Sequence, residues 1–368
     1  MIIYRSLLPL LFVLILVAPA AAAQAVPRTD TPRAGTLRVT FEPVITTWER
    51  EFTDSGREQR VGASLPTTVF IRAERRVTPL GLDFGITNRI AVGVRVPLVR
   101  VNVRESFPLD SAGDPADSAG KAALDTLLRG TTYAFDSISA NTPRHLRYFA
   151  GDIELEAKYR ILESHSYALS GALVVRLPTG HQDSPHDLFD IPTGDHQTDL
   201  EVQATQELVV AGRLWLNVAA RAGRQLEGTR ERRVGPQATL LIPRAATARL
   251  TWDPGDYAAI DVAPMYRFHR WFGVGVSAGY WTKQRDHYSY RSTQDSTDVA
   301  TRLGSAVAAS VLDAGTSQRW LRLGIVITYA VPDGEGSFSL ERTVSGSGGR
   351  VPATTVFRVV MRTSRWPF

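Results

Sequence analysis

The sequence of 368 residues contains no cysteine, which excludes a disulfide framework, a cysteine-ligated metal and a cysteine nucleophile. Lysine is almost as scarce, because arginine supplies all but Lys121, Lys158 and Lys283 of the 42 basic residues. The formal net charge is +5, yet the basic residues alternate with apolar ones and form no basic run, which argues against nucleic-acid binding. The length and a hydrophobic content of 43% allow one large domain or two ordinary ones.

Sequence signals of catalysis are also missing. An outer-membrane phospholipase would need a serine–histidine pair with an orienting polar partner, and none of the seven histidines stands in such a pattern. The glycine-rich stretch 346–349 lacks the strand-to-helix context of a phosphate-binding loop. The segment 179–196 carries histidine and aspartate that could bind a divalent cation, but their spacing matches no defined site. These residues are His181, Asp183, His186, Asp187, Asp190, Asp195 and His196. We therefore expect no enzyme, no cofactor and no metal site.

The N-terminus predicts export across the inner membrane. Residues 1–25 have a basic start at Arg5, a short apolar run over 7–17 and the small-residue pattern Ala23-Gln24-Ala25, which together are typical of a cleaved signal peptide. A membrane anchor is the alternative, but the run is shorter than the ~20 apolar residues that span a bilayer. The mature chain, 26–368, has no other apolar stretch of that length, and we expect it to form a single domain.

Apolar residues in the mature chain recur with a period of two, whereas helical spacing is nearly absent. One face of the segment 153–161 carries Ile153, Leu155, Ala157, Tyr159 and Ile161, and the other carries Glu154, Glu156, Lys158 and Arg160. The segments 214–222, 272–280 and 321–329 alternate in the same way. Such alternation predicts strands with one apolar and one polar face.

The length and spacing of these strands distinguish a membrane barrel from a soluble sandwich. Many strands span 12 or more residues, against about 5–6 in ordinary sheets. Every second connection is tight and the others are long, as in outer-membrane barrels. The expected strands cover 37–53, 67–87, 89–105, 148–162, 166–178, 197–210, 214–228, 256–268, 271–286, 316–331, 335–344 and 353–363.

We predict an all-β fold, a transmembrane antiparallel up-and-down β-barrel in the outer membrane with short periplasmic turns and long external loops. Twelve strands are expected. The number could be ten or fourteen, because 67–87 is ambiguous and 229–255 could supply a loop hairpin or two more strands. The C-terminal Phe368 supports this prediction, since such barrels commonly end in an aromatic residue that the barrel assembly machinery reads. Trp366 stands on the same strand face, although Pro367 interrupts the strand. The expected partners are therefore outer-membrane lipid, this machinery and a small-molecule solute of unknown identity.

Several short motifs between 78 and 228 resemble one known family. The motifs are Leu80-Gly81-Leu82-Asp83-Phe84-Gly85-Ile86-Thr87-Asn88-Arg89, then Gly151-Asp152-Ile153-Glu154-Leu155, Leu177-Pro178-Thr179-Gly180 and its near-repeat Ile191-Pro192-Thr193-Gly194-Asp195. They resemble the outer-membrane transporter-like family named for the meta-cleavage pathway of phenol degradation. The resemblance implies an outer-membrane channel for small hydrophobic or aromatic compounds, and it supplies no catalytic residues.

Many charged residues are expected on the inner face of the barrel. The predicted pore-lining residues are Arg95, Glu154, Glu156, Lys158, Arg160, Arg176, Glu201, Arg221, Asp261 and Arg322. The same register predicts that Arg38, Glu42, Arg100, Arg104, Glu207, Arg267 and Arg358 also point inward. These residues could line a water-filled pore that selects solutes by charge. Alternatively, they could pair with one another and plug a narrow barrel.

Two functions remain open at the level of sequence. One is a passive channel or uptake protein for small molecules, and the other is a structural or adhesive barrel whose long loops carry the interaction.

The sequence also predicts which side chains of one strand face the membrane. Leu321, Leu323, Ile325 and Ile327 should face lipid, while Arg322 faces the lumen. On that basis Leu323→Arg should impair folding and Arg322→Ala should be tolerated.

Overall fold

The computed structural model describes residues 28–63, 65, 67–136, 147–188, 190, 192–236, 241–269, 272–331 and 334–363. The expected signal peptide and the C-terminal residues Trp366, Pro367 and Phe368 lie outside these ranges.

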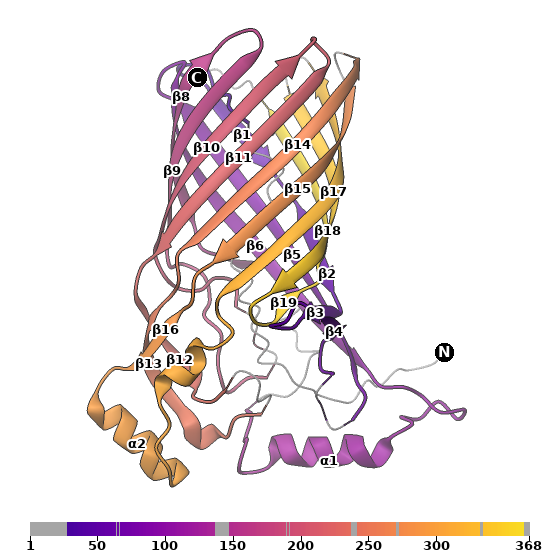
Figure 1. Ribbon diagram of the computed structural model, residues 1–368, viewed down its shortest axis with the longest axis vertical. Coiled ribbons are helices and arrows are strands. Elements are labelled where there is room, and N and C mark those ends of the chain that lie inside the picture. The colour runs from indigo at the N-terminus through magenta and orange to yellow at the C-terminus, as the bar shows by residue number, and fades with distance from the viewer. Residues whose placement is uncertain are drawn as a thin grey trace.

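Twelve strands in the described chain close into an antiparallel barrel with sequential neighbours (Figure 1). They are β1 (Leu37–Phe41) with β2 (Val44–Trp48) as one interrupted strand, β5 (Phe70–Gly85), β6 (Ile90–Ser106), β8 (Glu154–Glu163), β9 (Tyr167–Arg176), β10 (Asp199–Val210), β11 (Leu214–Gln225), β14 (Tyr257–His269), β15 (Phe272–Lys283), β17 (Gln318–Val331), β18 (Gly334–Ser347) and β20 (Thr355–Thr363). The barrel closes because β1 and β2 pair with both β5 and β20. The predicted fold and the expected strand number are thus confirmed, and the ambiguous 67–87 supplies one strand.

The first barrel strand is interrupted at Pro43. Phe41 pairs with Leu80 and Val44 with Val77, so β1 and β2 keep one register against β5. Proline has no backbone N–H to give to the sheet, which explains why the break occurs there without changing the pairing. Glu42, beside the break, is buried in the barrel interior.

The two ends of the barrel differ, and we call them the turn end and the loop end. Tight connections such as 86–89 and 211–213 close the turn end, which is the upper end in Figure 1. The loop end carries β3 (Arg50–Phe52), β4 (Glu58–Arg60), α1 (Ser118–Arg129), β7 (Phe149–Ala150), β12 (Gly228–Arg233), η2 (Arg244–Ala246), β13 (Thr247–Asp253), β16 (His287–Tyr290), α2 (Thr293–Leu303), η3 (Ala309–Asp313) and β19 (Val351–Pro352). The ambiguous 229–255 contributes a hairpin, β12–β13, that pairs with β16 outside the barrel.

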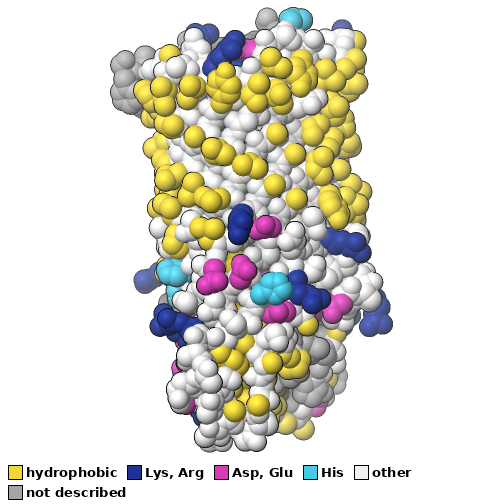
Figure 2. All heavy atoms as spheres, turned by 60° about the vertical axis from the view of Figure 1, so that its left-hand side comes forward, with side chains coloured by type: hydrophobic (Ala, Val, Ile, Leu, Met, Phe, Trp, Pro, Cys, Tyr) yellow, Lys and Arg dark blue, Asp and Glu magenta, His cyan; other side chains and the backbone are white. Residues whose placement is uncertain are grey.

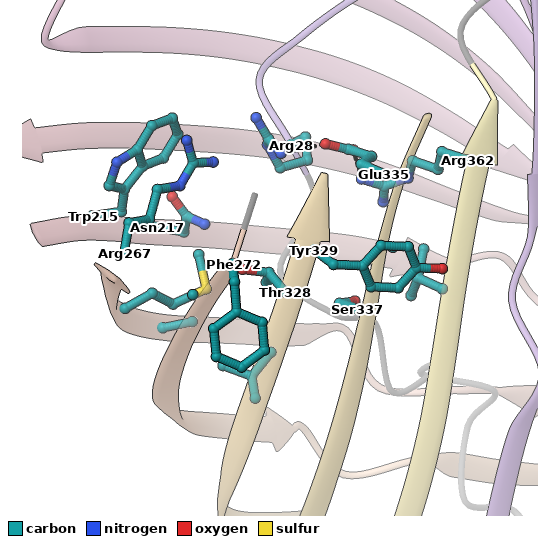
Figure 3. Close-up of a pocket in the computed structure, with 16 residues that line it drawn as sticks. Arg28, Trp215, Asn217, Arg267, Phe272, Thr328, Tyr329, Glu335, Ser337 and Arg362 are labelled. Atoms are coloured by element: carbon teal, nitrogen blue, oxygen red, sulfur yellow. Dashed lines mark hydrogen bonds and ion pairs between the residues drawn. The ribbon is translucent and has the colours of Figure 1, made fainter. Parts of the chain in front are cut away.

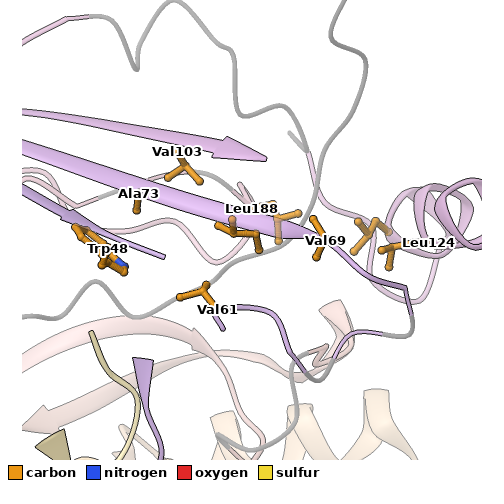
Figure 4. Packing of buried hydrophobic residues seen from close by; sticks show 9 residues of the cluster. Trp48, Val61, Val69, Ala73, Val103, Leu124 and Leu188 are labelled. Carbon is orange, nitrogen blue, oxygen red and sulfur yellow. The ribbon is translucent and has the colours of Figure 1, made fainter. Parts of the chain in front are cut away.

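The two α-helices in the described part of the loop end were not predicted. Asp117 caps α1 by accepting a hydrogen bond from the Gly120 N–H, and Leu124 and Leu128 bury one face of the helix. Figure 4 shows Leu124 beside Val69 and near Leu188, in a hydrophobic cluster at the loop-end mouth of β5 and β6. Among the described residues, no helix is long and apolar enough to cross a membrane.

Side chains on the barrel wall alternate between an exposed apolar face and a buried polar one. Leu323, Ile325 and Ile327 are exposed, whereas Arg322 is 6% exposed, so the predicted facing of β17 is confirmed. Figure 2 shows the apolar side chains as a broad band on the outside of the barrel. A strand reverses its side chains at every residue, which makes part of the expected inner set wrong. Arg100 and Arg104 lie on the opposite face of β6 from Arg95 and point outward.

Candidate functional site in the barrel interior

A ring of alternating charge runs around the inner wall of the barrel. Taken in strand order, acidic and basic side chains alternate, and we call this set the charge ring. Its members are Glu42, Arg358 of β20, Glu341 of β18, Arg322 of β17, Asp261 of β14, Arg221 of β11, Glu201 of β10, Arg176 of β9, Glu154 of β8 and Arg95 of β6. The ring contains five acids and five bases, so its formal net charge is zero.

Short ion pairs join neighbouring members of the charge ring. Arg322 Nε lies 2.7 Å from Glu341 Oε2, and Arg221 Nη2 lies 3.3 Å from Asp261 Oδ2. Glu154 bridges two arginines, at 3.1 Å from Arg176 Nη2 and 3.5 Å from Arg95 Nη1. These pairs link adjacent strands and satisfy charges that are largely removed from water.

Other contacts join two more members of the ring or tie its members to residues outside it. Arg358 Nε lies 3.6 Å from Glu42 Oε1, and the Arg358 side chain is fully buried. Arg176 also contacts Asp199 at 2.5 Å, and the Tyr257 hydroxyl donates a hydrogen bond to Glu201. Inward charges on most strands are therefore held by a partner on another strand.

Glycine occupies the two barrel strands that give no charge to the ring. Gly279 of β15 stands between Asp261 and Arg322, and a Cβ built on it would lie 2.5 Å from Asp261 Oδ1. Gly81 of β5 stands beside Arg95, whose Nε would lie 3.8 Å from a Cβ at that position. The missing side chains leave room for charges on the flanking strands to approach each other across the glycine strand.

The N-terminal segment 28–36 enters the barrel interior between the charge ring and the turn end. Arg28 bonds to Glu207 of β10 at 2.8 Å and to Glu335 of β18 at 2.5 Å. Lys158 of β8 donates a hydrogen bond to the Arg28 carbonyl oxygen. Because β8, β10 and β18 are separate parts of the wall, the segment crosses the lumen. Its polar residues look like an ordinary linker in the sequence, which gave no signal of this position.

Two cavities flank this N-terminal segment. Figure 3 shows the first, with Trp215 and Arg267 on one side and Arg28, Glu335 and Arg362 on the other. The Arg267 guanidinium lies 3.4 Å from the centroid of the Trp215 ring, and the apolar Met265 and Val360 complete this mixed lining. The second cavity is more polar, and its lining includes Asp30, Arg38, Asp83, Arg95, Glu156 and Lys158.

All ten residues predicted to line a pore project from the inner face of the barrel. Seven of them belong to the charge ring: Arg95, Glu154, Arg176, Glu201, Arg221, Asp261 and Arg322. Glu156, Lys158 and Arg160 lie farther toward the turn end on β8, and Arg160 pairs with Glu163 at 2.6 Å. Sequence reasoning therefore found the inward residues without finding their pairing, because it had no register between strands.

The histidine- and aspartate-rich segment 179–196 lies at the loop end. Among the described residues, no group of three or more histidine, aspartate or glutamate side chains is placed to hold a metal ion. His181 Nε2 lies 2.8 Å from Asp190 Oδ2, which is an ordinary loop contact. Burial raises the pKa of Asp183 to about 7, even though Arg232 and Arg230 nearby oppose this shift.

Comparison with known proteins identifies the fold. No protein-family model and no curated protein matches the chain. An outer membrane channel from Pseudomonas putida F1 is similar in structure, with a TM-score of 0.58 at 9% sequence identity over 91% of this chain and 97% of that one. The NanC porin (TM-score 0.39, 10% identity, 88% of this chain and 100% of that chain) is a more distant neighbour. The translocator domain of the autotransporter NalP from Neisseria meningitidis is another, with a TM-score of 0.42 at 8% sequence identity over 90% of this chain and 90% of that one. The fold is that of outer-membrane β-barrels, and the particular family named from sequence resemblance stays a prediction.

Proposed function

We propose that this chain is an outer-membrane channel through which small molecules pass passively. The observation that carries the proposal is a closed barrel with an apolar outer face and cavities inside it on both sides of the N-terminal segment. In a ring of alternating charges, the fields of neighbours cancel toward the axis, so the ring favours neither anions nor cations strongly. This arrangement, together with Trp215 and Met265 in the first cavity, supports small hydrophobic or aromatic compounds as solutes, as the sequence resemblance implies.

The location of the protein is part of this proposal. We expect the signal peptide to be removed after Ala25, the mature chain to fractionate with the outer membrane, and the assembly machinery to recognise Phe368. N-terminal sequencing of the purified protein should read from Val26. A sequence that starts at Met1, or recovery from the inner membrane, would contradict this expectation.

The N-terminal segment provides a direct test of transport. Deleting residues 26–33 removes Arg28 and Asp30 from the lumen and should raise the single-channel conductance in planar bilayers severalfold, because the segment that crosses the lumen is then lost. Arg28→Ala, which removes two ion pairs but keeps the segment, serves as the milder control and should raise conductance less. If the deletion variant is folded yet conducts no ions and admits no solute into liposomes, the channel proposal fails.

Two carboxylates on one strand should separate structural from transport roles. Glu154 bridges two arginines of the charge ring, whereas Glu156 lines the second cavity. We expect Glu154→Gln to lower the free energy of unfolding by about 2 kcal/mol, because charged hydrogen bonds are lost. Glu156→Gln should change stability little and move the reversal potential toward anion preference under a salt gradient. The opposite result, destabilisation from Glu156→Gln alone, would show that the charged residues around the second cavity form a structural network.

A structural or adhesive barrel is the second candidate function. The loop end has its own hydrophobic core, in which Leu250 and Trp252 of β13 pack with Tyr288 of β16 and Val299 of α2. A folded unit of this kind outside the barrel could present a binding surface without any transport. Conductance measurements discriminate the two functions, since an adhesive barrel stays closed even when the N-terminal segment is deleted.

A further inference from the structure

We propose that a belt of outward-facing arginines at the loop end binds phosphate groups of the glycolipid in the outer leaflet of the membrane. The belt comprises Arg72 and Arg76 of β5, Arg100 and Arg104 of β6, Arg224 of β11, Arg319 of β17 and Arg342 of β18. Each of these side chains lies on the same face of its strand as the exposed apolar residues, and none belongs to the interior described above. The proposal concerns the outside of the barrel and does not depend on transport.

Five of the seven belt residues lie at similar levels on the barrel wall. Arg76, Arg100, Arg224, Arg319 and Arg342 stand between 8 and 12 residues from the turn end of their strands. Arg72 and Arg104 lie 13 and 14 residues from it, farther toward the loop end. A strand rises about 3.3 Å per residue, and with a tilt of about 40° ten residues climb about 25 Å along the barrel axis. This height equals the ~25 Å apolar band of outer-membrane barrels. The belt therefore lies where the apolar band ends and lipid headgroups begin.

The apolar residues on the turn-end side of the belt support this position. On β5, the outward side chains toward the turn end are Leu80, Leu82 and Phe84, all of which are exposed. Figure 2 shows, on one face of the barrel, that charged side chains begin just beyond the apolar band on the loop side, where basic, acidic and histidine side chains are mixed. A guanidinium at this boundary can reach the phosphates while its methylene stem stays in contact with the acyl region.

The charges of the belt are balanced only in part by the barrel itself. Arg76 lies directly opposite Arg100, and Arg72 directly opposite Arg104, on adjacent strands. Like charges placed directly opposite each other destabilise a sheet unless an anion lies between them. Among the described residues of the barrel strands, Glu74 is the one outward-facing acid at this level, and it pairs with Arg76 at 2.7 Å. The remaining guanidinium groups favour an anionic partner from outside the chain.

The phosphates of a membrane glycolipid fit this surface better than free phosphate does. The arginines are spread over separate strands around the wall, not gathered into one pocket, so they match a layer of headgroups more closely than a single ion. Arginine suits phosphate because its planar guanidinium donates two parallel hydrogen bonds. Glycolipid that carries two phosphates could bridge directly opposed arginines on β5 and β6.

Binding of diphosphorylated lipid A to the full-length protein in neutral detergent, followed by native mass spectrometry and by titration, tests the proposal. A basic residue near an anionic membrane surface contributes about a fivefold gain in affinity. Replacing both Arg76 and Arg100 with glutamine should therefore weaken binding roughly 25-fold. The matched control replaces two exposed arginines of the turn end, Arg89→Gln with Arg213→Gln, and should change binding less than twofold. Removing the phosphates from lipid A should weaken its binding to the wild-type protein by a similar factor.

Several outcomes would overturn the proposal. Unchanged binding by the Arg76→Gln and Arg100→Gln variant is one, and an equal loss in the turn-end control is another. Complete displacement of lipid A by millimolar inorganic phosphate would show a site for the free ion instead of a lipid surface. If the β5–β6 variant does not fold, Arg224→Gln with Arg342→Gln tests the same belt on different strands.

Discussion

Arginine in place of Ile325 should destabilise the folded barrel by roughly 2–4 kcal/mol, the cost of a cation on the lipid face near the bilayer midplane. Ile325 is 54% exposed on the outside of β17 and lies between Val276 and Leu340 of the neighbouring strands, both of which are also exposed. An arginine there would be surrounded by apolar side chains and lipid, with no partner within reach. Reversible urea unfolding in lipid vesicles measures the change.

Leu323→Arg is the depth control for this experiment. Leu323 lies on the same face but directly opposite Arg342, which places it at the level of the arginine belt. We expect a smaller cost there than at Ile325, because arginine near the membrane interface costs only about 0–1 kcal/mol. Repulsion from Arg342 adds to this value. From the structure, we therefore expect arginine to be most harmful at Ile325, two residues from Leu323, the position that the sequence suggested. Equal effects of the two substitutions would mean that the depth, or the outward facing of β17, is wrong.

The barrel could be predicted from sequence because its closure imposes a strict alternation on every strand. Backbone groups in lipid must be paired within the sheet, so each strand is long, regular and apolar on one face. This rule predicted twelve strands and the correct facing of residues such as Arg322 and Leu323. The prediction for Arg100 and Arg104 was wrong because each lies an odd number of residues from Arg95, which puts them on the opposite face of the strand. The alternation along the sequence already implies this opposite facing.

The parts that could not be predicted depend on contacts between distant segments. The helix α1 forms inside a long loop where Leu124 and Leu128, four residues apart, gave only a short helical signal. The crossing of the lumen by residues 28–36 depends on Glu207 and Glu335, which lie far along the chain. The charge ring likewise requires the register between strands, since no local pattern says which acid meets which arginine.

The charge ring also reverses the expectation that Arg322→Ala would be tolerated. That expectation treated Arg322 as a solvated wall residue. Arg322 and Glu341 are instead each 6% exposed and 2.7 Å apart, and Glu341 also accepts a hydrogen bond from the Ser277 hydroxyl. Removing the arginine leaves a buried carboxylate without its main counter-charge.

A double-mutant cycle on this pair should show a large coupling energy. We expect Arg322→Met alone to cost roughly 3–5 kcal/mol of folding free energy, because Glu341 then stays buried and unpaired. Glu341→Leu alone should also be costly, because it removes the anion nearest to the buried guanidinium of Arg322. The double variant removes both charges while keeping side-chain volume, and it should recover most of the loss, since apolar replacement of a whole buried ion pair is often near neutral. Urea unfolding of the four proteins gives the coupling. If the two losses simply add, water reaches both charges, and the ring is a solvated wall that leaves the lumen open at this level.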